Sequence, residues 1–156
     1  MANSDFNFFE LLNDLMLINN DRIASYEKAI KELENVEDDK LKSLFNIMII
    51  VSHSNNAELE RSALLLGETT TNDASTPGKL YRLWLDIKPP LTYLSNRKGI
   101  LENCEKIEDA VQEVYKNALN TSGLFPEIFT LISIQKANLQ DSHNQIKKLR
   151  DLEYKQ

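Results

Sequence analysis

The sequence predicts an all-α fold: four long helices that form two helical hairpins, joined by a long crossover that contains a short helix. Three observations support this prediction. Glycine and proline number only four each among 156 residues and lie between the periodic segments or in their first turns, which favours long helices over a many-turned fold. Apolar residues recur at helical spacing along four long segments. The two halves of the chain also share a pattern of aliphatic, polar and tyrosine residues.

The bounds of each expected helix are predicted from the spacing of its apolar residues and from the glycine and proline residues at its ends. In the first helix Met16 and Ile23 belong to one apolar stripe, and Gly67 is a suitable C-terminal stop for the second helix. The short helix of the crossover ends before Pro89, and Pro126 suits the first turn of the last helix. The expected elements are the long helices 4–34, 40–66, 96–120 and 126–153 and the crossover 67–95 with its short helix 79–88.

The lengths of the connections predict how the helices are ordered in space. A short turn joins the helices within each hairpin, so these helices are antiparallel neighbours, whereas one long crossover joins the two hairpins. A single long connection is typical of the ferritin-like topology rather than of the simple up-down-up-down bundle. We therefore expect one ferritin-like domain over residues 1–156.

Charge and composition exclude several classes of function. The formal net charge is −6 and the pI is near 5.0, so the basic footprint of a nucleic-acid-binding protein is absent. No apolar run approaches the roughly 18 residues that span a membrane, and the start of the chain lacks the pattern of a signal peptide. Cys104 is the only cysteine, which fits a reducing compartment. We therefore expect a cytoplasmic protein that contacts neither nucleic acid nor membrane.

The internal repeat singles out a set of polar positions within the apolar stripes. It pairs Asn19 with Glu108, Tyr26 with Tyr115, and Ser52-x-x-Asn55 with Gln140-x-x-His143. Side chains three residues apart on a helix project together, so we expect these positions to meet in one layer across the bundle. In the simplest interpretation they form a buried polar layer, hydrogen-bonded internally and to water, that fixes the register of the helices.

The same positions raise the question of a metal site. Ferritin-like di-iron bundles take a carboxylate from the first helix of each hairpin and a Glu-x-x-His pair from the second, and such donors suit iron or manganese. Here only Glu108 and His143 are ordinary ligands, so the sequence predicts a degenerate di-iron site and no bound cofactor. The alternative is a single iron or manganese ion held by Glu108, His143 and Glu27. In either case we expect Glu108 and His143 to be neighbours across the bundle.

Several stretches of the chain resemble a known family. They are LINNDRIASYEKAI in the first helix, LYRLWLDIK in the crossover, ILENCEKIEDAVQEVYKNAL in the third helix and QDSHNQIKKLRDL in the fourth. Together they are similar to a bacterial family of ferritin-like four-helix-bundle proteins of unknown function, itself distantly similar to rubrerythrins and ferritins. The resemblance implies the ferritin-like fold and a bacterial cytoplasmic setting, and it implies no reaction.

Two main hypotheses of function follow. The first is a non-catalytic bundle that acts by self-association, as a homo-oligomer, or through a protein partner, with a stress response as a candidate setting. The second is a metal-binding or redox protein with a reduced ferritin-type ligand set. A carrier of a small ligand in the bundle interior is a third hypothesis, for which the sequence specifies no ligand.

Overall fold

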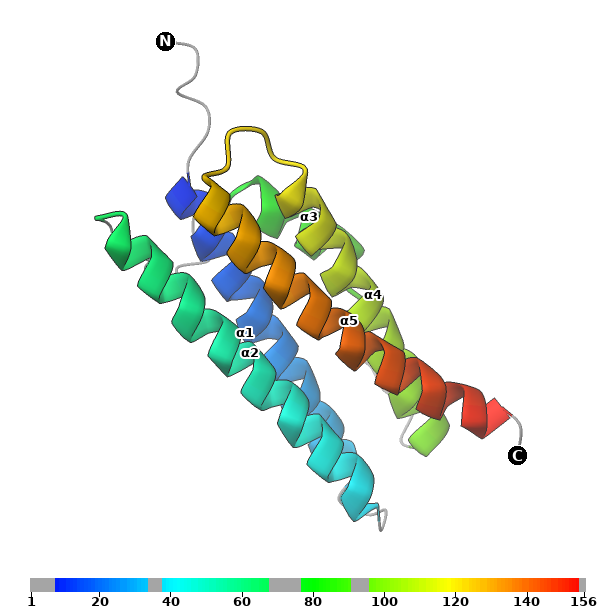
Figure 1. Cartoon of the computed structure of the whole chain (residues 1–156). Helices are drawn as coiled ribbons and strands as arrows, with labels where there is room; N and C mark the ends of the chain where they lie inside the picture. Colours follow the sequence, from blue (N-terminus) through cyan, green and yellow to red (C-terminus); the bar gives the residue numbers. More distant parts are fainter. Residues whose placement is uncertain (1–7, 34–37, 68–76, 91–95, 155–156) are drawn as a thin grey trace.

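A computed structural model of the chain describes residues 8–33, 38–67, 77–90 and 96–154. Helices α1 (Phe8–Glu32) and α2 (Asp39–Leu65) form the first hairpin, and α4 (Arg97–Leu119) and α5 (Pro126–Tyr154) form the second (Figure 1). The short helix α3 (Lys79–Ile87) lies between the hairpins in sequence. The described residues contain no strand. The predicted all-α bundle of two hairpins, with a helix in the crossover, is confirmed.

The observed helices begin and end where the local sequence provides caps. The Asp38 side chain accepts a hydrogen bond from the Leu41 N–H at 3.2 Å and begins α2, and the Asn96 side chain accepts one from the Gly99 N–H at 2.7 Å and begins α4. Gly67 follows α2 with a φ of 88°, a left-handed conformation that glycine adopts without strain. The parts of the expected first helix and crossover that lie outside the described residues are 4–7, 34, 68–76 and 91–95.

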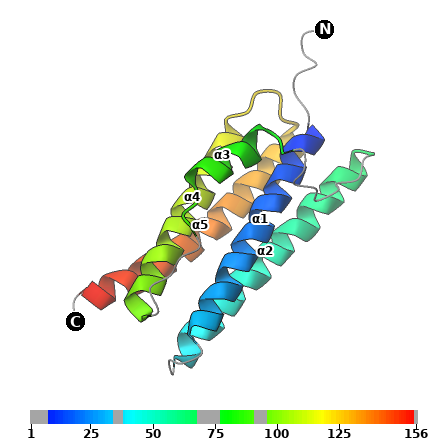
Figure 2. The ribbon, with the colours of Figure 1, turned by 180° about the vertical axis from the view of Figure 1, so that it is seen from behind.

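Each hairpin is closely packed, and the two hairpins meet mainly along α1 and α4. α1 packs extensively on α2, α4 packs in the same way on α5, and α2 and α5 touch each other much less. α3 packs on α1 and α4 and covers the seam between them, as the view from behind shows (Figure 2). No helix in the described part of the chain is long and apolar enough to cross a membrane.

Two apolar clusters fill the bundle, one on each side of a polar layer. The larger cluster includes Leu12, Ile18 and Trp84, and the smaller one includes Phe45 and Cys104. Burying one large apolar side chain contributes roughly 1.5–3 kcal/mol relative to leaving it exposed, so these clusters supply the main stabilisation of the fold. Along α1 and α2, the buried polar side chains other than Asp14 lie between the residues of the two clusters.

Two aspartates of α1 hold α3 against the bundle. Asp14 accepts hydrogen bonds from the backbone N–H groups of Gly78 at 3.0 Å and Tyr81 at 3.1 Å, so its carboxylate caps the N-terminus of α3 from a different helix. Asp21 accepts hydrogen bonds from the Tyr81 hydroxyl at 2.8 Å and from the Trp84 indole N–H at 2.9 Å. Trp84 is buried as a result and anchors the crossover to the first hairpin.

Gly78 lies so close to this cap that a β-carbon does not fit. An ideal Cβ at Gly78 would come within 2.3 Å of both Asp14 Oδ2 and Glu10 Cγ. We expect Gly78→Ala to displace Asp14 and to lower the free energy of unfolding by about 1–3 kcal/mol. Trp84 is the only tryptophan, so its fluorescence reports the docking of α3, and urea unfolding gives the stability. Lys79→Ala, at the exposed neighbouring position, should change neither the fluorescence nor the stability. Equal effects of the two substitutions would contradict the role of Asp14 as the cap of α3.

Candidate functional site

The centre of the polar layer is an ion pair between α1 and α4. Arg22 Nε donates a hydrogen bond to Glu108 Oε2 at 2.9 Å, and both side chains are fully buried. Water does not solvate either charge there, so each depends on the other and on the surrounding hydrogen bonds. This pair joins the two hairpins through their first helices.

The Arg22 guanidinium has further contacts with α2 and with an aromatic ring of its own helix. Arg22 Nη1 donates to the Met48 carbonyl oxygen at 2.9 Å and to Ser52 Oγ at 2.8 Å. The guanidinium carbon lies 5.2 Å from the centre of the Tyr26 ring. Burial alone would lower the pKa of Arg22, but the charge of Glu108 and the hydrogen bond between them outweigh burial and raise this pKa above its ordinary value. The result is a fixed cation in the middle of the bundle.

Tyr26 and Tyr115 show the internal repeat in three dimensions. Tyr26 on α1 donates a hydrogen bond to Glu108 Oε2 on α4 at 2.5 Å, and Asn19 on α1 donates one from Nδ2 to the Tyr115 hydroxyl on α4 at 2.9 Å. The two tyrosines therefore cross between the hairpins in opposite directions, each to a polar position that the repeat singles out. Burial and the charge of Glu108 raise the pKa of Tyr26, and burial raises the pKa of Tyr115, so both hydroxyls stay protonated at neutral pH.

A second group of hydrogen bonds extends the layer to α2 and α5. Asn55 Nδ2 donates to Asn19 Oδ1 at 3.2 Å. The Tyr115 hydroxyl donates to Gln135 Oε1 at 2.8 Å, and Gln135 Nε2 donates to the Asn55 carbonyl oxygen at 3.1 Å. The layer thus connects all four long helices, and a connected buried network of this kind favours one arrangement of the helices over others.

The structure brings most of the predicted polar positions together. Those that meet in the buried layer are Asn19, Tyr26, Ser52, Asn55, Glu108 and Tyr115. Gln140 does not belong to this layer, because its side chain is partly exposed and donates along its own helix, to Asn144 Oδ1 at 3.1 Å. The expectation for Gln140 is therefore wrong. Gln135 takes that place in α5, on the inward stripe between Ile132 and Leu139.

His143 and Glu27 lie away from Glu108. His143 Nε2 is hydrogen-bonded to Asp109 Oδ1 at the edge of the contact between α5 and α4, and Glu27 is exposed. The expectation that His143 faces Glu108 is wrong, because Ser142 rather than His143 continues the inward stripe of α5. The three candidate metal ligands therefore do not converge. Among the residues that the structure describes, no group of three His, Cys, Asp or Glu side chains could hold a metal ion.

Arg22 and Gln135 are the members of the layer that sequence reasoning missed. Arg22 lies three residues after Asn19 and four before Tyr26, so the spacing of the α1 stripe already places it inward. A basic side chain in one apolar stripe, together with a carboxylate in the equivalent stripe of the other hairpin, is the signal of a buried ion pair. Gln135 has the same kind of spacing within the apolar stripe of α5.

The polar layer does not fit a di-iron centre. In bundles of that kind, inward carboxylates from the four helices surround the metal ions, whereas here the cation beside Glu108 is Arg22. A divalent ion next to the guanidinium would meet a like charge in a medium of low polarity, which is unfavourable. Glu108 Oε1 accepts no hydrogen bond from the described residues, but one carboxylate oxygen beside a bound cation does not make a metal site. The layer offers no net negative charge to a metal.

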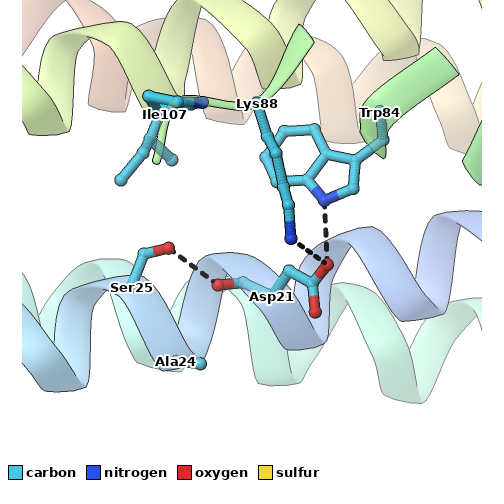
Figure 3. A pocket seen from close by; sticks show the side chains of 7 residues that line it. Asp21, Ala24, Ser25, Trp84, Lys88 and Ile107 are labelled. Carbon is cyan, nitrogen blue, oxygen red and sulfur yellow. Dashed lines mark hydrogen bonds and ion pairs between the residues drawn. The ribbon is translucent and has the colours of Figure 1, made fainter. Parts of the chain in front are cut away.

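A small cavity lies beside the layer, under α3 (Figure 3). Its volume is about 60 Å³, and its lining includes Asp21, Ser25, Trp84, Lys88 and Ile107. Trp84 Nε1 and Lys88 Nζ both approach Asp21 Oδ2, at 2.9 Å and 3.9 Å. A volume of this size holds a few water molecules and is far below the roughly 300 Å³ of a small-molecule site. The cavity therefore belongs to the docking of α3 rather than to a substrate site.

Comparisons with known proteins agree with the ferritin-like topology. A crystal structure described as that of ferritin like, diiron-carboxylate proteins from Bacillus anthracis str. Ames has a TM-score of 0.63 and 17% sequence identity, and the match covers 93% of this chain and 94% of the other. At this identity the likeness shows the fold alone, and it confirms the predicted ferritin-like bundle. A comparison with curated proteins finds no match. Residues 7–121 match a protein family, and the chain accordingly belongs to the family described as domain of unknown function (DUF2383).

Proposed function

We propose that this chain is a non-catalytic ferritin-like bundle that acts by self-association or through a protein partner. The observation that carries the proposal is the buried pair of Arg22 and Glu108. The interior region in which a di-iron bundle concentrates carboxylates contains a cation of the protein itself. The charges of the interior are therefore balanced without a metal, and the surface of the bundle is the part that other molecules meet.

The contacts of Arg22 support a permanent structural role for this cation. A buried ion pair is tolerated only when its geometry is good and its remaining donors are satisfied. The guanidinium meets both conditions through Glu108, the Met48 carbonyl and the Ser52 hydroxyl. Moving Arg22 aside to admit a metal ion would break these contacts, and losing one partner of such a pair costs about 3–5 kcal/mol. A metal ion bound by one carboxylate would not offset that loss.

The reactive side chains of the interior also support a non-catalytic role. Cys104 is fully buried, and burial raises the pKa of its thiol, whereas a nucleophilic cysteine needs a lowered pKa and an open approach for the substrate. Tyr26 and Tyr115 are fully buried as well, and their hydroxyls are engaged in hydrogen bonds. Because all three side chains are buried, a substrate cannot reach them.

The alternative of a metal-binding or redox protein with a reduced ligand set has less support from the geometry. His143 has Asp109 as its neighbour, and one imidazole with one carboxylate leaves most of the coordination sphere of iron or manganese without protein ligands. The bacterial cytoplasmic setting and the role in a stress response stay predictions from the sequence.

Elemental analysis tests the proposal. Protein from cells supplied with iron and manganese is expected to contain far less than one metal ion per chain, because Arg22 holds the position beside Glu108. Glu108→Gln, His143→Ala and Glu27→Gln should leave the metal content at the same low level, and Glu113→Gln is a matched control at an exposed position of α4 that was never a candidate ligand. Stoichiometric metal in the natural chain that is lost in Glu108→Gln or His143→Ala would overturn the proposal and favour the metal-binding alternative.

A further inference from the structure

Most of the exposed apolar side chains of the described residues lie on α2 and α5. Of the large hydrophobic side chains that stay exposed in the described residues, four lie on α2 and four lie on α5 or on the residue before it, whereas α1 and α4 carry none. The seam between α1 and α4 is covered by α3 (Figure 2). The apolar surface therefore lies on the two helices that no further described element covers.

α2 carries two stripes of apolar residues. One stripe, with Phe45 as a member, faces the core. The other follows steps of three and four residues, the spacing of helices that pack side by side. Its apolar members are Leu44, Ile47 and Val51 and, after polar residues at the intervening positions, Leu65. Ile47 is 53% exposed and Leu65 is 81% exposed. Leu44 and Val51 also pack on the edges of the core clusters, so core packing accounts for these two members of the stripe but not for Ile47 and Leu65.

α5 has a corresponding second stripe on the side that faces α2. Its apolar members are Leu131, Ile134, Leu149 and Leu152. Gln135 Nε2 on α5 donates a hydrogen bond to Glu58 Oε1 on α2 at 3.2 Å, which places the two helices side by side at this level. Nearer the start of α2, a groove of about 420 Å³ opens between the helices, and Leu44 and Leu149 lie in its lining. The surface that these two stripes form is called the α2–α5 face below.

The two ends of the α2–α5 face carry opposite charge. Lys40 and Lys148 line the groove at one end, beside the ion pair of Asp38 with Arg97, so the net charge of this lining is positive. Towards the other end, Glu58 lies at the α2–α5 contact, and Glu127 begins the α5 stripe. Arg61 follows Glu58 on the α2 stripe, so these three charges sum to −1. Rotation by 180° about an axis that runs across the helices, in the plane of the face, places the basic end of one copy over the acidic end of another. A twofold axis parallel to the helices would bring like ends together, which is electrostatically unfavourable.

We propose that the α2–α5 face binds the same face of a second copy of this chain, with the helices of the two copies antiparallel about a twofold axis. The inference rests on the proposed function, since it names the partner and the surface of association. A helix of the length of α2 spans about 40 Å, and two adjacent helices are about 20 Å wide, so each copy contributes roughly 800 Å². Stable complexes bury about this area on each partner. Because such a contact is isologous, the assembly closes as a dimer.

Sedimentation velocity of the natural chain and of single-site variants tests the interface. The natural chain is expected to sediment as a dimer. Ile47→Asp and Ile134→Asp each place a charge within the apolar part of the face and should give monomers whose far-ultraviolet circular dichroism is unchanged. Leu85→Asp is the matched control, because Leu85 is similarly exposed but lies on α3, and this variant should stay dimeric. A monomeric natural chain, or a dimer that both α2–α5 variants retain, would overturn the inference.

Charge reversal tests the antiparallel arrangement. Lys40→Glu with Lys148→Glu gives a face that is acidic at both ends, and Glu58→Lys with Glu127→Lys gives a face that is basic at both ends. Neither double variant is expected to form homodimers, whereas their equimolar mixture should form heterodimers. A mixture that stays monomeric while the natural chain dimerises would reject this arrangement. Stoichiometric metal would contradict the proposed function without affecting the dimer, and loss of the dimer would contradict this inference alone.

Discussion

Replacing Arg22 by methionine is expected to lower the free energy of unfolding by about 3–5 kcal/mol, because the substitution leaves Glu108 buried without its partner. Met48 and Ser52 lose the donor that Arg22 provides at the same time. Domains of this size are stable by only about 5–15 kcal/mol, so the loss is a large part of the total. Urea unfolding at neutral pH, followed by circular dichroism, measures the change.

The double variant Arg22→Met/Glu108→Leu separates the loss of one partner from the loss of the pair. Replacing both buried charges by apolar groups of similar volume is often neutral or even stabilising, so we expect the double variant to regain most of the lost stability. The recovery stays incomplete, because Tyr26 loses the acceptor of its hydroxyl. Arg82→Met, at an exposed position on α3, should change stability by less than about 0.5 kcal/mol. An Arg22→Met variant as stable as this control would contradict the buried pair.

The helices could be predicted from the sequence because their signals are local. Apolar spacing identifies a helix over many residues at once, so a single misleading position does not alter the result. The sequence determines the rotation of each helix about its axis less well. Positions three and four residues from a buried residue both lie on its side of the helix, and spacing alone does not decide which of the two is buried. In α5 the candidates after Leu139 were Ser142 and His143, and packing against the other helices buries Ser142. The predicted contact between Glu108 and His143 failed at this step.

The ion pair was missed because no local pattern links its two members, which are 86 residues apart in the chain. Arginine is rarely buried unless it is paired, so a charged side chain within a stripe is easily interpreted as part of the solvated surface. The internal repeat gave no help at this position, since Arg22 corresponds to Val111 in the other hairpin. The repeat did single out Asn19, Tyr26, Glu108 and Tyr115 as positions of one layer, and these four residues form the two tyrosine contacts. The repeat therefore identifies several members of the layer on α1, α2 and α4, but it misses Arg22, and on α5 it selects Gln140 and His143 instead of the buried Gln135.

The stability of the bundle is expected to fall steeply as the pH rises above about 9, because three buried groups keep their protons in the folded chain. Burial raises the pKa of Cys104, Tyr26 and Tyr115 in the folded state. In the unfolded chain a thiol ionises at about pH 8.5 and a tyrosine at about pH 10. Above these values the unfolded state binds fewer protons than the folded state, so the stability that is present below the unfolded pKa is lost with rising pH.

The expected size of this loss follows from the number of retained protons. Each proton held only by the folded state contributes a slope of about 1.4 kcal/mol per pH unit, so three such groups give up to about 4 kcal/mol per unit above about pH 10. Urea unfolding at several pH values between about 7 and 11 measures this slope. Cys104→Ala should remove the contribution to this slope that begins at about pH 8.5. Tyr115→Phe should reduce by one proton the contribution that begins at about pH 10.

The change of slope distinguishes this linkage from a general loss of packing. Both substitutions lower stability at neutral pH to some extent, but a packing defect shifts the whole curve of stability against pH without altering its steepness. A residual slope is expected even when both are combined, because Tyr26 remains, and because burial and the hydrogen bond to Asp21 raise the pKa of Tyr81 to about 12. Variants whose stability falls with pH as steeply as that of the natural chain would show that Cys104 and Tyr115 ionise without unfolding, and hence that the layer around Arg22 is open to water.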